Sequence, residues 1–364
     1  MAISAYGAKM KLTTTIVATL LLPIFGVVQQ AFAQNSSSKV HVQAGQSIQE
    51  AIDAAEPGSH IVVEAGTYTE QLTITNDGTL LIGLGAILVP PSNMTNNTCS
   101  GLAGPDTEAG ICITGADIEL ADFVVEHRKV MSVGTPVKDV LVTGFEVHNF
   151  TGQNIAVVGG DGVLITGNTL QDGDSYGVLT VGSNNTIIDG NTVDSADVLR
   201  FIAICMDDKG DTWVSNNQIS GYYIGLCCQT ANARVFGNNV TNSCAGAFVD
   251  PGVKGVHLFN NSVAQPSPNC TAESGTAGIV VGGGINSTIE FNEVEGMKTV
   301  NKTGAGIAII DFPTGDTVAI PTDNRVIHNF AHDNDYDLAL VSNGTGNVFQ
   351  DNDCDTPAEL CSPS

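Results

Sequence analysis

The sequence is poor in charged and aromatic residues. Only 14% of its 364 residues are charged, 5% are aromatic, and a single one is tryptophan. This composition disfavours a helical bundle, which needs long runs of Ala, Glu, Lys and Leu, whereas 41 glycines are typical of a β-rich, turn-rich body. Basic residues are scarce too, because 13 Lys and Arg stand against 38 Asp and Glu. The resulting formal net charge of −25 disfavours nucleic acid as a partner.

Long apolar runs are confined to the first residues. Residues 1–33 have the features of a secretory signal peptide: Lys9 and Lys11, an apolar stretch, and the small-x-small site Ala31-Phe-Ala33. An N-terminal membrane anchor is the alternative interpretation of this segment. No later run reaches the ~20 apolar residues that a membrane helix needs. We therefore predict a secreted, extracellular protein with no membrane span.

All nine cysteines lie after residue 33, and none has the spacing of a zinc site. This usage favours an oxidising compartment and disulfide bonds. Eleven Asn-x-Ser/Thr sequons further favour a secreted glycoprotein. We predict the disulfides Cys99–Cys112, Cys205–Cys227, Cys244–Cys270 and Cys354–Cys361, which leave Cys228 unpaired.

A short phrase, in which alternating apolar residues lead to an asparagine, recurs from Val163 onward. An irregular period, mostly in the twenties of residues, indicates a solenoid whose coils bury their apolar faces against each other. We interpret the asparagines as structural, because Asn suits turns and stacked Asn side chains can form a ladder. The repeated asparagines are Asn168, Asn191, Asn217, Asn238, Asn261, Asn292, Asn329 and Asn352.

The start of the chain predicts a capped helix. Ser47 and Glu50 have the spacing of a capping box, and Ile48 and Ile52 give the helix an apolar face. Together with the following strand pattern, this region resembles the N-terminal cap of pectin-lyase-like right-handed parallel β-helices. The motifs that carry the resemblance are Gln46-Ser-Ile-Gln-Glu-Ala-Ile-Asp-Ala-Ala55, Pro57-Gly58, Ile61-Val-Val63 and Gly66-Thr-Tyr-Thr-Glu70.

The resemblance implies an all-β protein, a single-stranded right-handed parallel β-helix with an N-terminal capping helix. We predict a monomer with one such domain at residues 39–364, after the signal peptide and a linker at 34–38. Within it, residues 39–85 form the cap and first coils, and residues 354–364 form a C-terminal tail. Residues 86–116 break the rhythm and predict a loop beside the coils, after which Ile118 to Val125 and Val140 to Val147 resume the strands.

A second phrase, of the type apolar-small-apolar, alternates with the Asn phrase. Its middle residue should point outward, since side chains alternate along a strand. Small outward residues on stacked strands would leave a shallow trough for an extended chain, although a neighbouring loop could fill it instead. The small residues expected to point outward are Ala156, Ala203, Gly225, Ala308 and Ala339.

The resemblance also implies a carbohydrate-active protein, a polysaccharide-degrading enzyme acting on a cell-wall glycan. A glycoside hydrolase would use two carboxylates, ~6.5–9.5 Å apart if inverting. A polysaccharide lyase would use a base helped by a cation such as Ca²⁺. The motifs of pectin methylesterases, polygalacturonases, pectate lyases and alginate epimerases are incomplete or missing, so both reactions stay open. The alternative is a non-catalytic β-helix that binds a glycan or a surface.

Acidic residues follow several strands of the predicted trough. Because alternate coils are ~9.6 Å apart, two such carboxylates could flank one bond. Acids that merely solvate turns are the competing interpretation, since the chain has 38 of them. The predicted catalytic residues are Asp207, Asp208, Asp250 and Asp311, and the predicted substrate-binding residues are Arg200, Lys209 and Lys254.

Two further clusters carry weaker signals. Asp333, Asp335 and Asp337 alternate as at the start of a Ca²⁺ loop, but the Gly and the later Glu of an EF-hand are missing. A polar turn is therefore the alternative to a metal site there. His127-Arg128-Lys129 is the only basic run. It could supply a lyase base or hold a carboxylate, or it could be a solvated edge.

Overall fold

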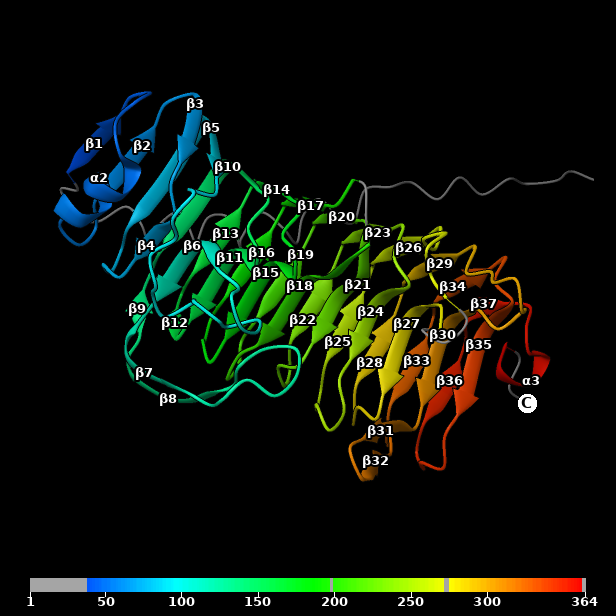
Figure 1. Ribbon diagram of the computed structural model, residues 1–364. Coiled ribbons are helices and arrows are strands. Elements are labelled where there is room, and N and C mark those ends of the chain that lie inside the picture. Colours follow the sequence, from blue (N-terminus) through cyan, green and yellow to red (C-terminus); the bar gives the residue numbers. More distant parts are fainter. Residues whose placement is uncertain (1–37, 197–198, 272–274, 362–364) are drawn as a thin grey trace, which may run out of the picture. The chain divides into compact units, whose positions relative to one another are not determined.

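The computed structural model describes residues 38–196, 199–271 and 275–361, which lie in one compact unit. The predicted signal peptide, and all of the predicted linker except Ser38, lie outside the described residues. Within the unit the chain winds through parallel strands coil after coil (Figure 1), and successive coils pair strand on strand. The predicted right-handed parallel β-helix is confirmed.

Two faces of each coil belong to a 21-stranded sheet. One face holds β1 (Lys39–Val42), β2 (His60–Val63), β5 (Leu80–Val89), β10 (Leu141–His148), β13 (Leu164–Thr166), β16 (Ile187–Asp189), β19 (Trp213–Ser215), β22 (Arg234–Phe236), β25 (His257–Phe259), β28 (Thr288–Glu290), β33 (Arg325–Ile327) and β36 (Val348–Gln350). The other continues β5 and β10 and holds β3 (Gly66–Thr69), β14 (Thr169–Gln171), β17 (Thr192–Asp194), β20 (Gln218–Ser220), β23 (Asn239–Thr241), β26 (Ser262–Ala264), β29 (Glu293–Glu295), β34 (Phe330–His332) and β37 (Asp353–Cys354).

The third face is a ten-stranded parallel sheet, which we call the groove sheet. It consists of β4 (Leu72–Ile74), β6 (Ala109–Thr114), β11 (Gln153–Val158), β15 (Tyr176–Val181), β18 (Arg200–Asp207), β21 (Tyr222–Cys228), β24 (Ala245–Val249), β27 (Ala277–Gly282), β30 (Ala305–Ile310) and β35 (Tyr336–Val341). Three small pairs complete the strands: the hairpin β7 (Ala116–Leu120) and β8 (Val130–Thr135), the parallel pair β9 (Val137–Lys138) and β12 (Gly160–Asp161), and the hairpin β31 (Phe312–Thr314) and β32 (Thr317–Ala319).

The repeated asparagines form the predicted ladder inside the solenoid. Each side-chain amide from Asn168 to Asn329 donates to the side-chain oxygen of the next asparagine, at 2.9 to 3.0 Å. That oxygen also accepts the backbone N–H of the preceding rung, so the buried side-chain amide and the backbone N–H of these rungs both have partners. The left-handed backbone belongs to the residue before each rung, such as Gly190 or Asn260, and not to the rung itself.

The N-terminal helix α2 (Ile48–Ala54) caps the solenoid as predicted. Ile48 and Ile52 are buried in the main apolar core, and Ser47 accepts the N–H of Glu50 at 3.1 Å. The capping box predicts that the side chain of Glu50 reaches back to the N-terminus of the helix. In the structure the carboxylate of Glu70 accepts there instead, from the N–H groups of Ile48 and Gln49. A carboxylate at this end also interacts favourably with the positive end of the helix dipole. The second helix is the single turn α3 (Ala358–Cys361), and neither described helix has the length or apolarity of a membrane crossing.

Three of the four predicted disulfides are present: Cys99–Cys112, Cys244–Cys270 and Cys354–Cys361. The prediction for Cys205–Cys227 is wrong in this structure. These two cysteines do face each other on paired strands, but both are buried free thiols that form a hydrogen bond. Cys228 is free, as predicted.

The segment between β5 and β10 differs most from its prediction. Ile118 does not resume the coils, because β7 and β8 pair antiparallel as a hairpin off the solenoid. We call residues 99–108 and 115–130, which flank β6, the cover, because they lie against the outer face of the first strands of the groove sheet. A second apolar core joins the two, with Cys99 and Leu102 on one side and Ala156 and Leu179 on the other.

Candidate functional site

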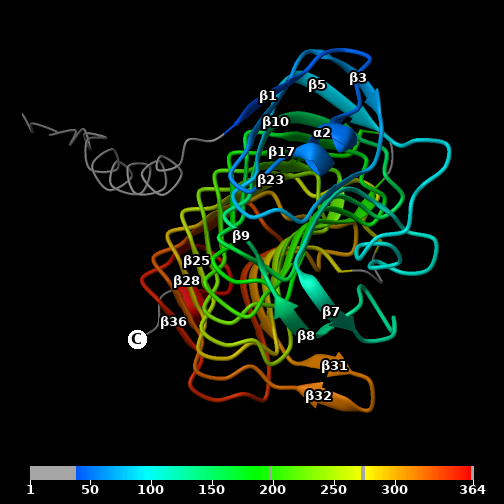
Figure 2. The ribbon, with the colours of Figure 1, turned by 90° about the vertical axis from the view of Figure 1, so that its left-hand side faces the viewer.

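A groove of about 1050 Å³ runs along the outer face of the groove sheet, from β18 to β35. The cover borders it at one end, and the hairpin β31–β32 contributes Phe312 and Thr314 to its lining. The two hairpins, β7–β8 and β31–β32, project from the same side of the solenoid (Figures 1 and 2). The floor between them is apolar, built largely of Phe248, Val280 and Ala308.

The trough prediction is correct for Ala156, Ala308 and Ala339 but wrong for two coils. Ala203 belongs to the inner core, and a side chain at Gly225 would meet Val240 of that core. Ile204 and not Ile202 stacks in line with Val178 and Ile155, and Ala203 takes the position of Gly177, where a side chain also faces the inner core. The outward residues of these coils are therefore Cys205 and Cys227.

This register brings three polar residues into one outward column. Met206, Cys228 and Val249 stack on one another, so the residues that follow them, Asp207, Gln229 and Asp250, form the next step of the ladder. The backbone N–H groups of Gln229 and Asp250 continue the ladder. They donate to the carbonyl oxygens of Met206 and Cys228, with N–O distances of 2.9 and 3.1 Å. All three line the groove. Two strand intervals place the backbones of Asp207 and Asp250 ~9.6 Å apart.

The cover adds three side chains to this column. His127, only 1% exposed, lies with Nε2 3.1 Å from Oδ2 of Asp207. Lys129 forms an ion pair of 3.1 Å with the same oxygen and donates to Gln229 at 2.5 Å. Gln229 in turn donates to the carboxylate of Glu126 at 2.7 Å. We call the six residues Glu126, His127, Lys129, Asp207, Gln229 and Asp250 the groove-end cluster.

The two aspartates of the cluster have opposite pKa shifts. Burial, followed by the negative charge of Glu126, raises the pKa of Asp250 to about 8. Burial also acts to raise the pKa of Asp207, but the hydrogen bond to His127 and the positive charge of Lys129 outweigh it, so the pKa of Asp207 is lowered. At neutral pH the pair of aspartates therefore has one protonated and one ionised carboxyl group. This combination can give a proton at one point and accept a proton at another.

The other two predicted catalytic acids lie elsewhere. Asp208 is buried on the opposite side of the strand end, where its carboxylate accepts from Thr180, Thr212 and the N–H of Ser183. Asp311 accepts from Ser342 and Asn343 of the next coil and is not part of the groove lining. Asp208 and Asp311 thus stabilise turns through hydrogen bonds. Of the four predicted catalytic acids, the structure brings Asp207 and Asp250 together.

The predicted substrate-binding cations also lie outside the groove lining. Arg200, at the start of β18, forms an ion pair with Asp174. Lys209 is exposed at a bend, and Lys254 is exposed in an isolated β-bridge with Ile285. The cation that the structure brings to the acidic pair is Lys129. The basic run that contains it is evident in the sequence, but the sequence does not show that this run lies beside the acidic residues. Gln229 and Glu126 gave no sequence signal.

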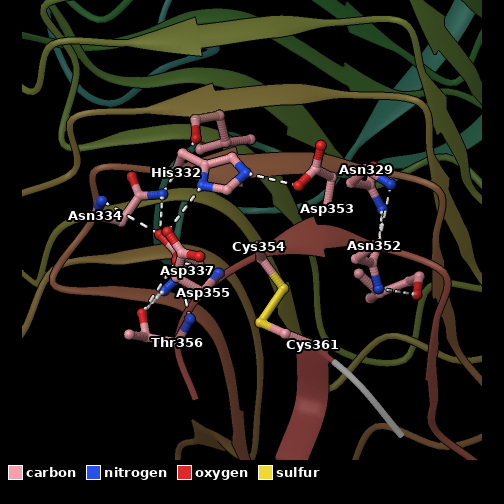
Figure 3. The surroundings of a disulfide bond; sticks show 12 residues. Asn329, His332, Asn334, Asp337, Asn352, Asp353, Cys354, Asp355, Thr356 and Cys361 are labelled. Carbon is pink, nitrogen blue, oxygen red and sulfur yellow. Dashed lines mark hydrogen bonds and ion pairs between the residues drawn. A yellow bond between two sulfur atoms is a disulfide. The ribbon is translucent and has the colours of Figure 1, made fainter. Parts of the chain in front are cut away.

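The predicted metal ligands have separate protein partners. Asp333 pairs with Lys298, Asp335 accepts the N–H groups of Thr299 and Gly304, and Asp337 accepts five donors. Within the described parts of the chain, one group of three metal-ligating side chains has donor atoms within 4.8 Å of one another: His332, Asp337 and Asp355. Figure 3 shows that Asp337 is surrounded by Asn334, Asp355 and Thr356, near the disulfide Cys354–Cys361. The polar-turn interpretation accounts for these contacts.

Fold and site together define a right-handed parallel β-helix protein with an acidic pair at one end of an outer groove. The profile of the family described as Periplasmic copper-binding protein (NosD) matches residues 92–276, about half of the chain. The chain belongs to this family. The matched segment contains the cover and the whole groove-end cluster. No curated protein matches the sequence.

Several solved structures with a similar fold are, by their titles, enzymes that act on polysaccharides. The A-module of mannuronan C-5 epimerase AlgE6 of Azotobacter vinelandii has a TM-score of 0.58 and 13% identity, over 85% of this chain and 91% of that one. An alginate lyase from a Paenibacillus strain has a TM-score of 0.53 and 14% identity, over 85% and 99%. A family 28 exopolygalacturonase of Yersinia enterocolitica has a TM-score of 0.52 and 14% identity, over 86% and 76%. At such identities the likeness concerns the fold.

The family description raises the question of copper, and the described residues do not fit it well. The soft donors nearest the groove are the paired thiols of Cys205 and Cys227, and burial raises the pKa of both. Cu(I) prefers thiolates, so it would have to displace the protons of these two buried thiols. The group of His332, Asp337 and Asp355 lies outside the matched segment, and the oxygens of Asp337 are occupied by protein donors. We derive no chemistry from copper.

Proposed function

We propose that this protein is a glycoside hydrolase that cleaves a polysaccharide bound along the groove of its solenoid. The observation that carries the proposal is the column of Asp207, Gln229 and Asp250, in which two carboxyl groups have opposite pKa shifts. Their backbone separation of ~9.6 Å is close to the ~6.5–9.5 Å between the carboxyl groups of inverting enzymes. The similar folds of polysaccharide-acting enzymes support the substrate class.

Each aspartate has one role in the proposed reaction. Protonated Asp250 gives its proton to the leaving glycosidic oxygen. Ionised Asp207 takes a proton from the water molecule that attacks the opposite face of the sugar carbon. Both contacts of Asp207 with His127 and Lys129 use Oδ2, which leaves Oδ1 for that water. His127 and Lys129 keep Asp207 ionised and in place.

The charge of the groove supports hydrolysis of a neutral glycan over elimination from a uronate. A lyase needs cationic charge to neutralise the substrate carboxylate. Among the described residues, the groove lining contains one cation, Lys129, and it is already paired with Asp207. With Asp250 protonated, Glu126 and Asp207 leave a net negative charge, which repels uronates. The three disulfides fit an oxidising compartment, so we place the reaction outside the cytosol, on an extracellular or cell-wall glycan.

The test is a panel of neutral and uronate polysaccharides incubated with the purified protein, with and without Ca²⁺. Reducing ends and the absorbance of unsaturated products are measured for the wild type, Asp207→Asn, Asp250→Asn and the control Asp53→Asn. We expect reducing ends from a neutral polymer and a loss of about 10²–10⁴-fold in each groove variant. Asp53, on α2, accepts a hydrogen bond from the side chain of Gln49 away from the groove and should be neutral to activity.

Other outcomes distinguish the alternatives. Unsaturated products from a uronate polymer would show a lyase and contradict hydrolysis. Binding to a polysaccharide without cleavage, unchanged by Asp207→Asn and Asp250→Asn, would show the non-catalytic glycan-binding protein instead. Copper bound with a defined stoichiometry and lost on substitution of Cys227 would show that the groove serves the metal named in the family description.

A further inference from the structure

The groove is closed at its β18 end by the cover. On the outer face of β11, β15 and β18, the residues Ala156, Leu179 and Cys205 are fully buried under it. The disulfide Cys99–Cys112 ties the cover to β6 of the groove sheet. No extended chain can lie on this part of the sheet, because the second apolar core already occupies it.

The edge of the cover stands at the acidic pair itself. His127 is 1% exposed and its ring contacts both Asp207 and Tyr176. Lys129 and Glu126 reach Gln229, one coil further along the groove. The groove lining on the groove sheet begins with β18, the strand that carries Asp207. Asp207 and Asp250 therefore lie at the last position that a bound chain can reach.

The other end of the groove remains open. Beyond Asp250 the floor continues over Val280, Ala308 and Ala339 to β35. There Val341 is 68% exposed and Tyr336 49% exposed. Three strand intervals separate β24 from β35, a length of about 14 Å. The long part of a substrate thus has room on one side of the acidic pair only.

We infer that the enzyme acts on the ends of polysaccharide chains and releases short products, because the groove is blocked directly behind its two aspartates. This inference rests on the proposed function. The terminal sugar enters under the edge of the cover, and the rest of the chain lies over the apolar floor toward β35. Glu126, Lys129 and Gln229 are the specificity-determining residues that meet the hydroxyl groups of the terminal unit.

The first experiment needs no variant. The wild type is incubated with the neutral polymer of the panel that it cleaves fastest, and viscosity, reducing ends and product sizes are followed from the earliest times. We expect one short product size while viscosity stays nearly constant. A rapid fall in viscosity with products of many sizes would overturn chain-end action and leave the hydrolase proposal standing. If no polymer is cleaved, the proposed function fails, and the inference fails with it.

A second experiment assigns the effect to the cover. In Glu126→Ala with Lys129→Ala, the closed end is widened, and we expect longer products beside the short one. The control is Glu119→Ala, on the same hairpin, whose carboxylate contacts Ser132 outside the groove. It should keep the single product size. An unchanged product size in the double variant would show that these side chains do not set the end of the groove, and would contradict their assigned role.

Discussion

The two halves of the groove sheet have the same interior and different exteriors. Inside, β15 and β30 present stacked apolar residues such as Val178 and Ile307, and the asparagine ladder runs past both. Outside, Leu179 on β15 is sealed under the cover, whereas Ala308 on β30 forms the floor of the groove. The interior repeat thus supplies the frame, and a single insertion divides its outer surface into a closed and an open part.

The groove-end cluster lies where these two parts meet. Asp207 contacts His127 of the cover, and Asp250 lies two coils beyond Asp207. The contrast in their surroundings shifts their pKa values in opposite directions. A boundary between a covered and an open surface thus gives two identical side chains the opposite pKa shifts that the proposed acid and base require.

The largest effect on stability is expected from the asparagine ladder, which is the same in both halves. Asn191→Ala, in the covered half, and Asn292→Ala, in the open half, each remove the acceptor of a buried backbone N–H and of a side-chain amide. Each unsatisfied buried group costs about 1–3 kcal/mol, so we expect about 3 kcal/mol or more for either variant. Denaturant unfolding measures both, with Asn239→Ala as a control because its amide donates to the exposed side chain of Gln218. Clearly unequal losses would contradict an equivalent interior.

The next effect should separate the halves. Replacing Cys99 and Cys112 by serine removes a link across 13 residues, which costs about 3 kcal/mol by chain entropy. Hydrogen exchange should rise in residues 99–130 and on β11, and stay unchanged on β30. The matched control replaces Cys244 and Cys270, whose disulfide is in the open half and should leave the cover protected. Equal exchange over both halves would show that the cover is not an independent layer.

The fold could be predicted because its signals are local and repeated. The capping motif around Ser47 and the asparagine phrase each specify backbone and packing within a few residues. The register of the groove sheet was harder, since Ile202-Ala-Ile204 has the same pattern as Ile155-Ala-Val157 but is shifted by two residues in the structure. An apolar-small-apolar triplet does not determine its own register.

The site could be predicted only in part, for the same physical reason. Asp207 and Asp250 follow repeated strands, so their position on the solenoid was accessible from the period. Glu126 and Lys129 meet Gln229 across sequence separations of 103 and 100 residues. The sequence around them contains no repeat, and the folding of the cover alone brings them to the groove.

A smaller effect is expected from one large side chain placed on each outer surface. Ala156→Phe must fit beneath the cover, where overpacking typically costs about 1–3 kcal/mol. Ala308→Phe extends into the groove and should change stability by only about 0.5 kcal/mol. It should nevertheless reduce polysaccharide cleavage, while any remaining activity of Ala156→Phe should keep its KM. Thermal unfolding and kinetics of both variants check this reversal, and equal destabilisation would contradict an open floor.

The smallest effect concerns the boundary itself. Asp250 must be protonated to act as the acid, so activity should fall as the pH rises through about 8. The charge of Glu126 raises this pKa, and Glu126→Gln should therefore move the alkaline limb to lower pH. Burial is the larger cause of the raised pKa of Asp250 and remains in the variant. The alkaline limb should therefore move by only part of the total pKa shift. Glu119→Gln on the same hairpin should leave the profile unchanged, and pH–rate profiles of all three proteins decide the matter.

The same titration should appear in stability without any substrate. The folded-state pKa of Asp250 is above its unfolded value of about 3.9, so the folded state binds the extra proton between about pH 4 and 8. The contribution of Asp250 to stability is therefore fully present below pH 4 and is lost as the pH rises through about 8. Asp250→Asn, which cannot ionise, should unfold at a higher temperature than the wild type at pH 9. A constant difference between the two proteins from pH 4 to 9 would contradict a raised pKa, and with it the division of roles across the edge of the cover.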